Sequence, residues 1–109
     1  MTSSEYRPKP LKLAEVRAVV IEAIRRGTYH DTRHIRFDHP EREIWVQDVI
    51  AALKQSWSGC SVDGFSGEHW QWKYKIRTVD IEEETLFVVV ALDPKNIRFD
   101  IITGFYDRS

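Results

Sequence analysis

A histidine and an arginine in the first half of the chain could together act on a phosphodiester. His34 precedes Arg42 by eight residues, and histidine is the side chain best suited to exchange protons near neutral pH. RNA can be cleaved without a metal when a base takes the 2′-hydroxyl proton, cations stabilise the charged phosphorane and an acid protonates the leaving oxygen. The pair is therefore a candidate for acid–base and charge-stabilising chemistry. The alternative is a loop histidine, with Arg42 bridging to Glu41 or to a helix end.

Metal and cofactor chemistry find little support in the sequence. His30, His34 and His39 lie close together, but a zinc site needs three or four ligands in tetrahedral reach, often thiolates. Cys60 is the only cysteine, and Pro40 keeps the histidines off one helical face. The chain has no phosphate loop or dinucleotide fingerprint. We therefore expect no metal and no cofactor, and we interpret Cys60 as structural because a reactive thiol needs a lowered pKa.

The clearest pattern in the chain lies at residues 69–77, where apolar and cationic side chains alternate. The apolar members are Trp70, Trp72, Tyr74 and Ile76, and the cations are Lys73, Lys75 and Arg77. Period two predicts a strand with one apolar and one cationic face. Such a row of cations could bind an RNA backbone, and Arg98 and Tyr106 could extend it from the last strand. The alternative is a solvated face whose cations pair with the acidic run at 80–84 or with Asp100.

Two helices precede the strands that must position these side chains. Residues 12–26 carry apolar side chains at three- and four-residue steps and end at Gly27, which predicts an amphipathic helix with a glycine stop. Residues 46–55 predict a second helix in the same way. Between them, residues 28–37 predict a short strand or an extended connector.

The sequence of the second half of the chain predicts a β-meander. Residues 56–68 are rich in glycine and serine and predict a loop that could hold a short strand at 60–62. The acidic run at 80–84 predicts a hairpin turn, and the apolar run at 86–92 predicts a central strand covered on part of both faces. For the last strand, residues 97–105, alternation puts Phe99, Ile101, Thr103 and Phe105 on one face and Arg98, Asp100, Ile102 and Tyr106 on the other.

Length and composition limit the architecture and the location. The chain has 109 residues, of which 42% are hydrophobic and 30% charged, with a net charge of -1. We expect a disordered tail over residues 1–10 and a single α+β domain over residues 11–109, with the N-terminal helices packed on one face of an antiparallel meander of three to four strands. No segment reaches the ~20 apolar residues of a membrane span, and no signal peptide is evident, so we expect a cytoplasmic protein that does not bind membranes.

The order of these motifs resembles a known family, the domain-of-unknown-function 4258 family of small bacterial proteins, within the RelE/ParE-like toxin superfamily. The likeness covers about residues 12–106 and departs from the family pattern at Asp38, Pro40 and Glu43. The matching positions are His34, Arg42, Ile44, Asp48, Val49, the strand at 88–90 and Thr103.

The resemblance implies a RelE-like fold and a toxin-like, metal-free endoribonuclease that acts on mRNA. His34 would be the general acid or base, Arg42 would stabilise phosphate charge, Thr103 would position the substrate, and Lys73 and Lys75 would bind the backbone. The implied partners are RNA or the ribosome, and an antitoxin protein. The alternative is a non-catalytic protein-binding module of the same fold, ParE-like or antitoxin-binding, that contacts its partner through the exposed sheet or through Trp57 and Phe65. A third reading is an inactive relative kept for regulation.

Overall fold

The computed structural model describes residues 9–32, 44–67 and 70–107. These residues form two helices and a five-stranded mixed sheet. The elements in chain order are α1 (Leu13–Arg26), β1 (Tyr29–Asp31), α2 (Val46–Leu53), β2 (Gly59–Ser66), β3 (Gln71–Val79), β4 (Thr85–Asp93) and β5 (Arg98–Tyr106). The α+β class is confirmed, and the sheet has more strands than the sequence predicts. Within the described residues, neither helix has the length and apolar character needed to cross a bilayer.

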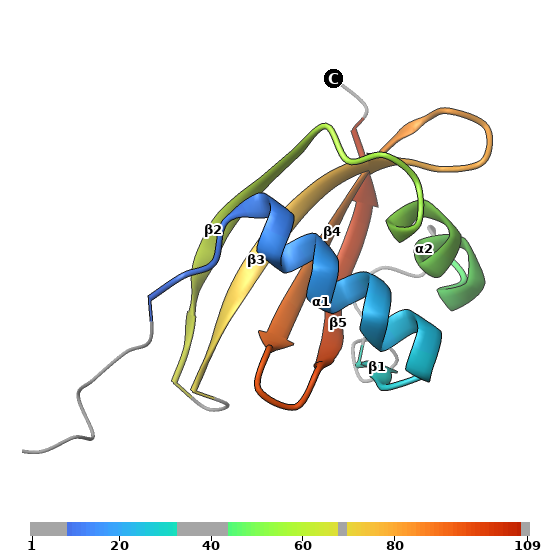
Figure 1. Ribbon diagram of the computed structural model, residues 1–109. Helices are drawn as coiled ribbons and strands as arrows, with labels where there is room; N and C mark the ends of the chain where they lie inside the picture. Colours follow the sequence, from blue (N-terminus) through green and yellow to red (C-terminus); the bar gives the residue numbers. More distant parts are fainter. Residues whose placement is uncertain (1–8, 33–43, 68–69, 108–109) are drawn as a thin grey trace, which may run out of the picture.

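The strands lie in the order β1-β5-β4-β3-β2. Strands β2 to β5 form the predicted antiparallel meander, whereas β1 lies parallel to β5 at the edge of the sheet. Both helices lie on the same side of the sheet in Figure 1, with α1 crossing the strands and α2 beside it. We call this side of the sheet the helix face.

Helix α1 forms where its sequence predicts. The Glu15 carboxylate accepts a hydrogen bond of 2.9 Å from the backbone N–H of Lys12 at the start of the helix. Val16, Val20 and Ala23 are fully buried, as expected for one apolar stripe. Gly27 follows with a φ of 75°, a left-handed conformation that glycine adopts without steric cost.

Helix α2 is tied to both the sheet and α1 by hydrogen bonds at its C-terminus and just beyond it. The Thr78 hydroxyl donates to the Ala52 carbonyl at 2.7 Å, and the Arg17 guanidinium donates to the Gln55 carbonyl at 2.8 Å. Carbonyl groups at a helix C-terminus have no partner within the helix. The Thr78 hydroxyl therefore satisfies a carbonyl group in the last turn of α2, and Arg17 satisfies one in the residues that follow the helix.

The core lies between the helices and the sheet. Its fully buried side chains from the sheet include Ile76, Leu86, Val88, Val90 and Ile101. In β4, positions of the opposite parity are also covered, since Val89 is 5% and Ala91 1% exposed. The prediction of a central strand covered on both faces is therefore confirmed.

An irregularity in β5 changes which side chains share a face. Val90 pairs with Ile101 and Val89 with Thr103, so Ile102 is an extra residue in the ladder, a β-bulge. After the bulge the alternation shifts by one position. Thr103 and Phe105 therefore lie on the same side as Arg98 and Asp100, and the predicted division of this strand is wrong beyond Ile101.

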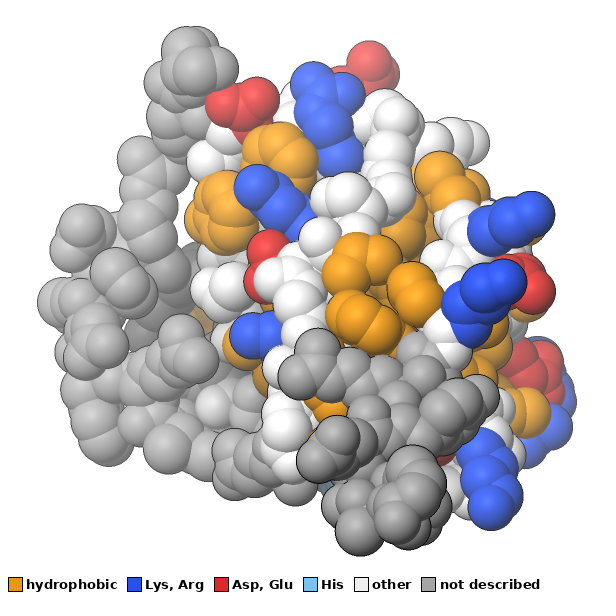
Figure 2. Space-filling model, turned by 90° about the vertical axis from the view of Figure 1, so that its left-hand side faces the viewer, with side chains coloured by type: hydrophobic (Ala, Val, Ile, Leu, Met, Phe, Trp, Pro, Cys, Tyr) orange, Lys and Arg blue, Asp and Glu red, His pale blue; other side chains and the backbone are white. Residues whose placement is uncertain are grey.

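The β2–β3 hairpin also differs from the prediction. The glycine- and serine-rich segment forms the eight-residue strand β2. The residue between Val62 and Gly64 has no partner on β3 and forms a β-bulge, and Gly64 beside it has a φ of 141°. Trp70 lies before β3 with a φ of 55° and does not continue the alternation. Its ring packs edge-on against Phe65, which also packs against Trp72. Figure 2, turned toward this edge, shows apolar side chains in the middle of the surface with Lys and Arg side chains around them.

Candidate nucleic-acid interface

The alternation in β3 divides its side chains between the two sides of the sheet. Tyr74 and Ile76 are 2% and 0% exposed on the helix face. The side chains between them lie on the other side, which we call the cationic face. It includes Lys73, Lys75 and Arg77 from β3, Phe87 from β4, and Thr103 and Phe105 from β5, together with Arg98 and the acidic Asp100 near the β1 edge.

The Lys75 ammonium lies over two aromatic rings of the cationic face. Its Nζ is 4.8 Å from the centre of the Phe87 ring and 5.5 Å from that of Phe105. The two rings stack on each other with their centres 5.3 Å apart. Attraction between the cation and the ring faces holds the ammonium without neutralising it. Phe105 remains 42% exposed beside this charge.

The other two cations of the β3 row have neutral neighbours. Arg77 is exposed and donates a hydrogen bond of 2.8 Å to the Ser58 hydroxyl. Lys73 pairs with Gly64 on β2 and with Ala91 on β4, so its stem lies between positions with little or no side chain. Among the residues described, no carboxylate lies within ion-pair distance of Lys73, Lys75 or Arg77. The pairing with acidic residues that the sequence left open is therefore not seen in this part of the chain.

Thr103 lies in the same row of the sheet as Lys75. Both residues pair with Val89, one from each side of β4. Their Cα atoms are therefore separated by two strand spacings, roughly 10 Å. The bulge at Ile102 is what puts the Thr103 side chain on the cationic face, so this predicted site residue lies on the same side as the predicted backbone-binding row.

Arg98 stands at the start of β5, near the edge strand β1. It is exposed, and its guanidinium contacts the Nδ1 atom of His30 at 3.2 Å. His30 pairs with Asp100, which lies 3.6 Å from the same imidazole nitrogen. In the sequence, His30 stands out only as one of three neighbouring histidines. The parallel pairing of β1 with β5 that places it here has no short-range signal, because the two strands are about seventy residues apart.

Tyr106 does not extend the cationic face, contrary to the prediction. Because it follows the bulge, its side chain lies on the helix side, and its hydroxyl donates a hydrogen bond of 2.8 Å to the Asp80 carboxylate. Burial, together with the hydrogen bond and charge of Asp80, raises the pKa of Tyr106 to about 12. This phenol therefore fastens the end of β5 to the β3–β4 turn.

His34, His39 and Arg42 lie outside the described residues, and the structure therefore says nothing of their position. Burial raises the pKa of Cys60 to about 11, which disfavours the thiolate that a nucleophile requires. In the described ranges, no three His, Cys, Asp or Glu side chains are grouped so that they could hold a metal ion.

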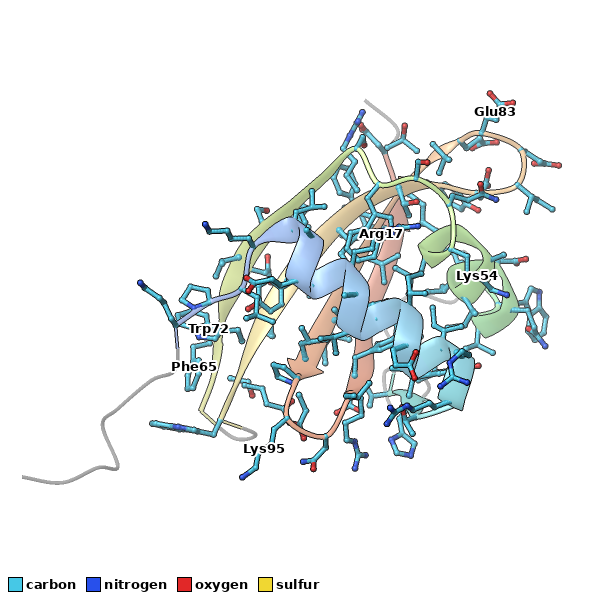
Figure 3. All side chains as sticks on the ribbon, viewed as in Figure 1. Arg17, Lys54, Phe65, Trp72, Glu83 and Lys95 are labelled. Atoms are coloured by element: carbon cyan, nitrogen blue, oxygen red, sulfur yellow. The ribbon has the colours of Figure 1, made fainter. Side chains whose placement is uncertain are left out.

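The aromatic side chains of the alternative hypothesis have different surroundings. Trp57 is half-buried; its Nε1 donates to the Leu53 carbonyl at 2.9 Å, and the Arg17 guanidinium lies over its ring. Phe65 stands beside Trp72 at the far end of the β2–β3 hairpin, away from the acidic turn that carries Glu83 (Figure 3). Phe65 has an exposed aromatic neighbour in Trp70, whereas Trp57 is engaged by Leu53 and Arg17, so Phe65 is the better candidate for contact with a partner.

Comparison of the chain with protein families, with characterised proteins and with solved structures found no match.

Proposed function

We propose that this protein is a metal-free endoribonuclease of the toxin type, with a RelE-like fold, that acts on mRNA in the cytoplasm and binds the RNA backbone on its cationic face. The observation that carries the proposal is the row of Lys73, Lys75 and Arg77 without a described carboxylate partner. Cations along a strand suit a phosphate backbone, because binding releases the counterions of the nucleic acid.

The stacked rings beside the row favour single-stranded RNA over a duplex. Proteins that bind single strands combine a positive track for the backbone with aromatic faces on which bases stack. Phe105 is partly exposed next to the ammonium of Lys75. A base lying on Phe105 would leave its phosphate within the reach of the β3 cations.

The cleavage step in this proposal is a transfer within the RNA. A base takes the proton of the 2′-hydroxyl, the 2′-oxygen forms a bond to phosphorus, and the bond from phosphorus to the 5′-oxygen breaks. An acid then protonates the 5′-oxygen, which leaves a 2′,3′-cyclic phosphate and a 5′-hydroxyl. His34 would transfer the proton, Arg42 would stabilise the phosphorane, and the Thr103 hydroxyl would position the phosphate.

Two substitutions test binding and chemistry separately. Lys75→Gln should weaken binding of a single-stranded RNA and lower the salt slope of the affinity by about 0.7, the value of one lost contact to a single strand. Lys54→Gln, which removes the same charge from the end of α2, should change neither.

His34→Ala should abolish the formation of cyclic phosphate in the presence of a chelator while circular dichroism stays that of the wild type. Intact RNA after incubation with the wild-type protein would refute the nuclease.

The aromatic cluster of Phe65, Trp70 and Trp72 favours a second candidate function, a non-catalytic module that binds a protein such as an antitoxin. Trp70 is 43% exposed and held edge-on by Phe65, and aromatic side chains are enriched at the centres of protein interfaces. In that case RNA stays whole at every pH, and Trp70→Leu weakens partner binding while Lys75→Gln does not.

A further inference from the structure

His30 lies at the β1 edge of the sheet, in contact with two charged side chains of β5. Its Nδ1 is 3.2 Å from the Arg98 Nη2 atom and 3.6 Å from Asp100 Oδ1. The imidazole is 68% and the Asp100 side chain 22% exposed. Three further charged residues end the helix before β1, but Arg25 and Arg26 there both pair with Glu22. Asp31, the next residue of β1, pairs with Ile101 and so belongs to the opposite face of the strand.

The contact with Arg98 defines the tautomer of the neutral imidazole, that is, which of its two nitrogens carries the proton. A guanidinium can only donate hydrogen bonds, so Nδ1 must accept and the proton must be on Nε2. In this state the positive charge of Arg98 and the negative charge of Asp100 cancel. These three side chains therefore carry no net charge, and Asp93 of β4, which pairs with Arg98 across the ladder and accepts hydrogen bonds from Asn96, adds a negative charge beside them.

A second proton on the imidazole would reverse this arrangement. Nδ1 could no longer accept from Arg98, and its new N–H would face the Asp100 carboxylate. Arg98 would then lose its acceptor, and both its freed N–H and the imidazole Nε2–H would be donors without a partner in the group. The group would also gain a net positive charge, so its best new ligand is an oxyanion.

We propose that His30 and Arg98 form a phosphate subsite for the RNA backbone that is filled when the imidazole is protonated. This proposal rests on the proposed RNA binding by the cationic face. His30, Asp100, Ala91 and Lys73 form one row across four strands, which spans roughly 14 Å. An RNA strand that crosses the sheet along this row would place separate phosphates at Lys73 and at His30.

The test is binding of a 2′-O-methyl oligonucleotide, which cannot be cleaved, measured by fluorescence anisotropy. Binding is measured at both ends of the range from pH ~8 to pH ~5, in which histidine is the side chain suited to change its charge. Over this range the affinity of the wild-type protein should rise about 3- to 10-fold, and the salt slope should steepen by about 0.7, as for one added contact to a single strand. His30→Gln should bind with little pH dependence. Arg98→Gln should lose the gain at low pH, whereas His39→Gln should keep it.

Failure of the His30–Arg98 subsite and failure of RNA binding as a whole would give different results in this experiment. If His30→Gln gains affinity on acidification as the wild type does, the subsite is wrong and RNA binding by the β3 row stands. If the wild-type protein binds the oligonucleotide at neither pH, the proposed function fails and the subsite fails with it. Binding by the wild type that Lys75→Gln leaves unchanged, but that His30→Gln weakens at low pH, supports the subsite and overturns the β3 row.

Discussion

The Tyr106 hydroxyl donates a hydrogen bond to Asp80 that joins the end of the last strand to the turn between β3 and β4. The same carboxylate also accepts the backbone N–H groups of Glu82 and Glu84, each at 2.9 Å. One aspartate therefore orders both the acidic turn and the end of β5. Asp80 is 8% exposed, and its buried charge is compensated by these three donors.

This contact predicts a loss of stability at alkaline pH. The pKa of Tyr106 is about 12 in the folded protein against an ordinary value of 10, so the folded state holds the phenol proton more tightly than the unfolded state does. The stabilisation is complete below pH 10 and is lost as the pH rises from 10 through 12. Tyr106→Phe should lower the free energy of unfolding by roughly 1 kcal/mol at pH 8, and its difference from the wild type should shrink above pH 10. Urea unfolding at several pH values measures this; a difference that stays constant through pH 12 would contradict it.

The stacked phenyl rings predict a specific contribution to nucleic-acid binding. Base stacking on an aromatic side chain contributes about 1–3 kcal/mol per base, so Phe105→Leu should weaken binding of a single-stranded oligonucleotide roughly 10-fold at constant salt slope. Trp70→Leu removes an equally exposed aromatic ring from the β2–β3 hairpin and should leave RNA binding unchanged. The reverse ranking of the two variants would place the RNA on the β2–β3 hairpin and not on the cationic face.

The alternation in β3 predicts a graded response to a new carboxylate. Ile76→Asp should unfold the protein, because an unpaired charge at a site with 0% exposure costs several kcal/mol, a large part of the ~5–15 kcal/mol that stabilises a domain. Trp72→Asp should be milder, since Trp72 is half-buried at the margin of the core. Lys73→Asp, on the cationic face, should change the urea midpoint least. Equal damage at Ile76 and Lys73 would be inconsistent with the division of β3 between two faces.

Local patterns in the sequence predicted the parts of the fold that local interactions determine. The helix ending at Gly27, the second helix from Val46 and the two faces of β3 follow from periodicity and end signals, and they are confirmed. The pairing of β1 with β5 could not be predicted, because a parallel contact between distant segments has no local signature. Strand β2 was predicted only as a short strand at 60–62 within a loop, because its glycine and serine content resembles that of a loop.

For the candidate site, the extra residue Ile102 decides which side chains were assigned to the correct face. The β3 cations were placed correctly by alternation, but Thr103, Phe105 and Tyr106 were assigned to the wrong sides because no sequence signal marks Ile102 as a bulge. A single added residue moves every later side chain to the other face. The contribution of Phe105 to the cationic face and the contact between His30 and Arg98 therefore became visible only in three dimensions.

The bulge itself predicts that Ile102 can be removed. Deletion of Ile102 would let Thr103 follow Ile101 directly while Val89 and Val90 keep their present partners, so every later side chain would stay on its face. The variant should fold, with a loss limited to about 1–2 kcal/mol for the half-buried side chain, and should bind RNA as the wild type does. Deletion of Val89 is the control, because it forces half of β4 onto the wrong face relative to both neighbours and should abolish folding. Circular dichroism and urea unfolding compare the two; an unfolded Ile102 deletion would show that the extra residue is needed for the strand to close on the sheet.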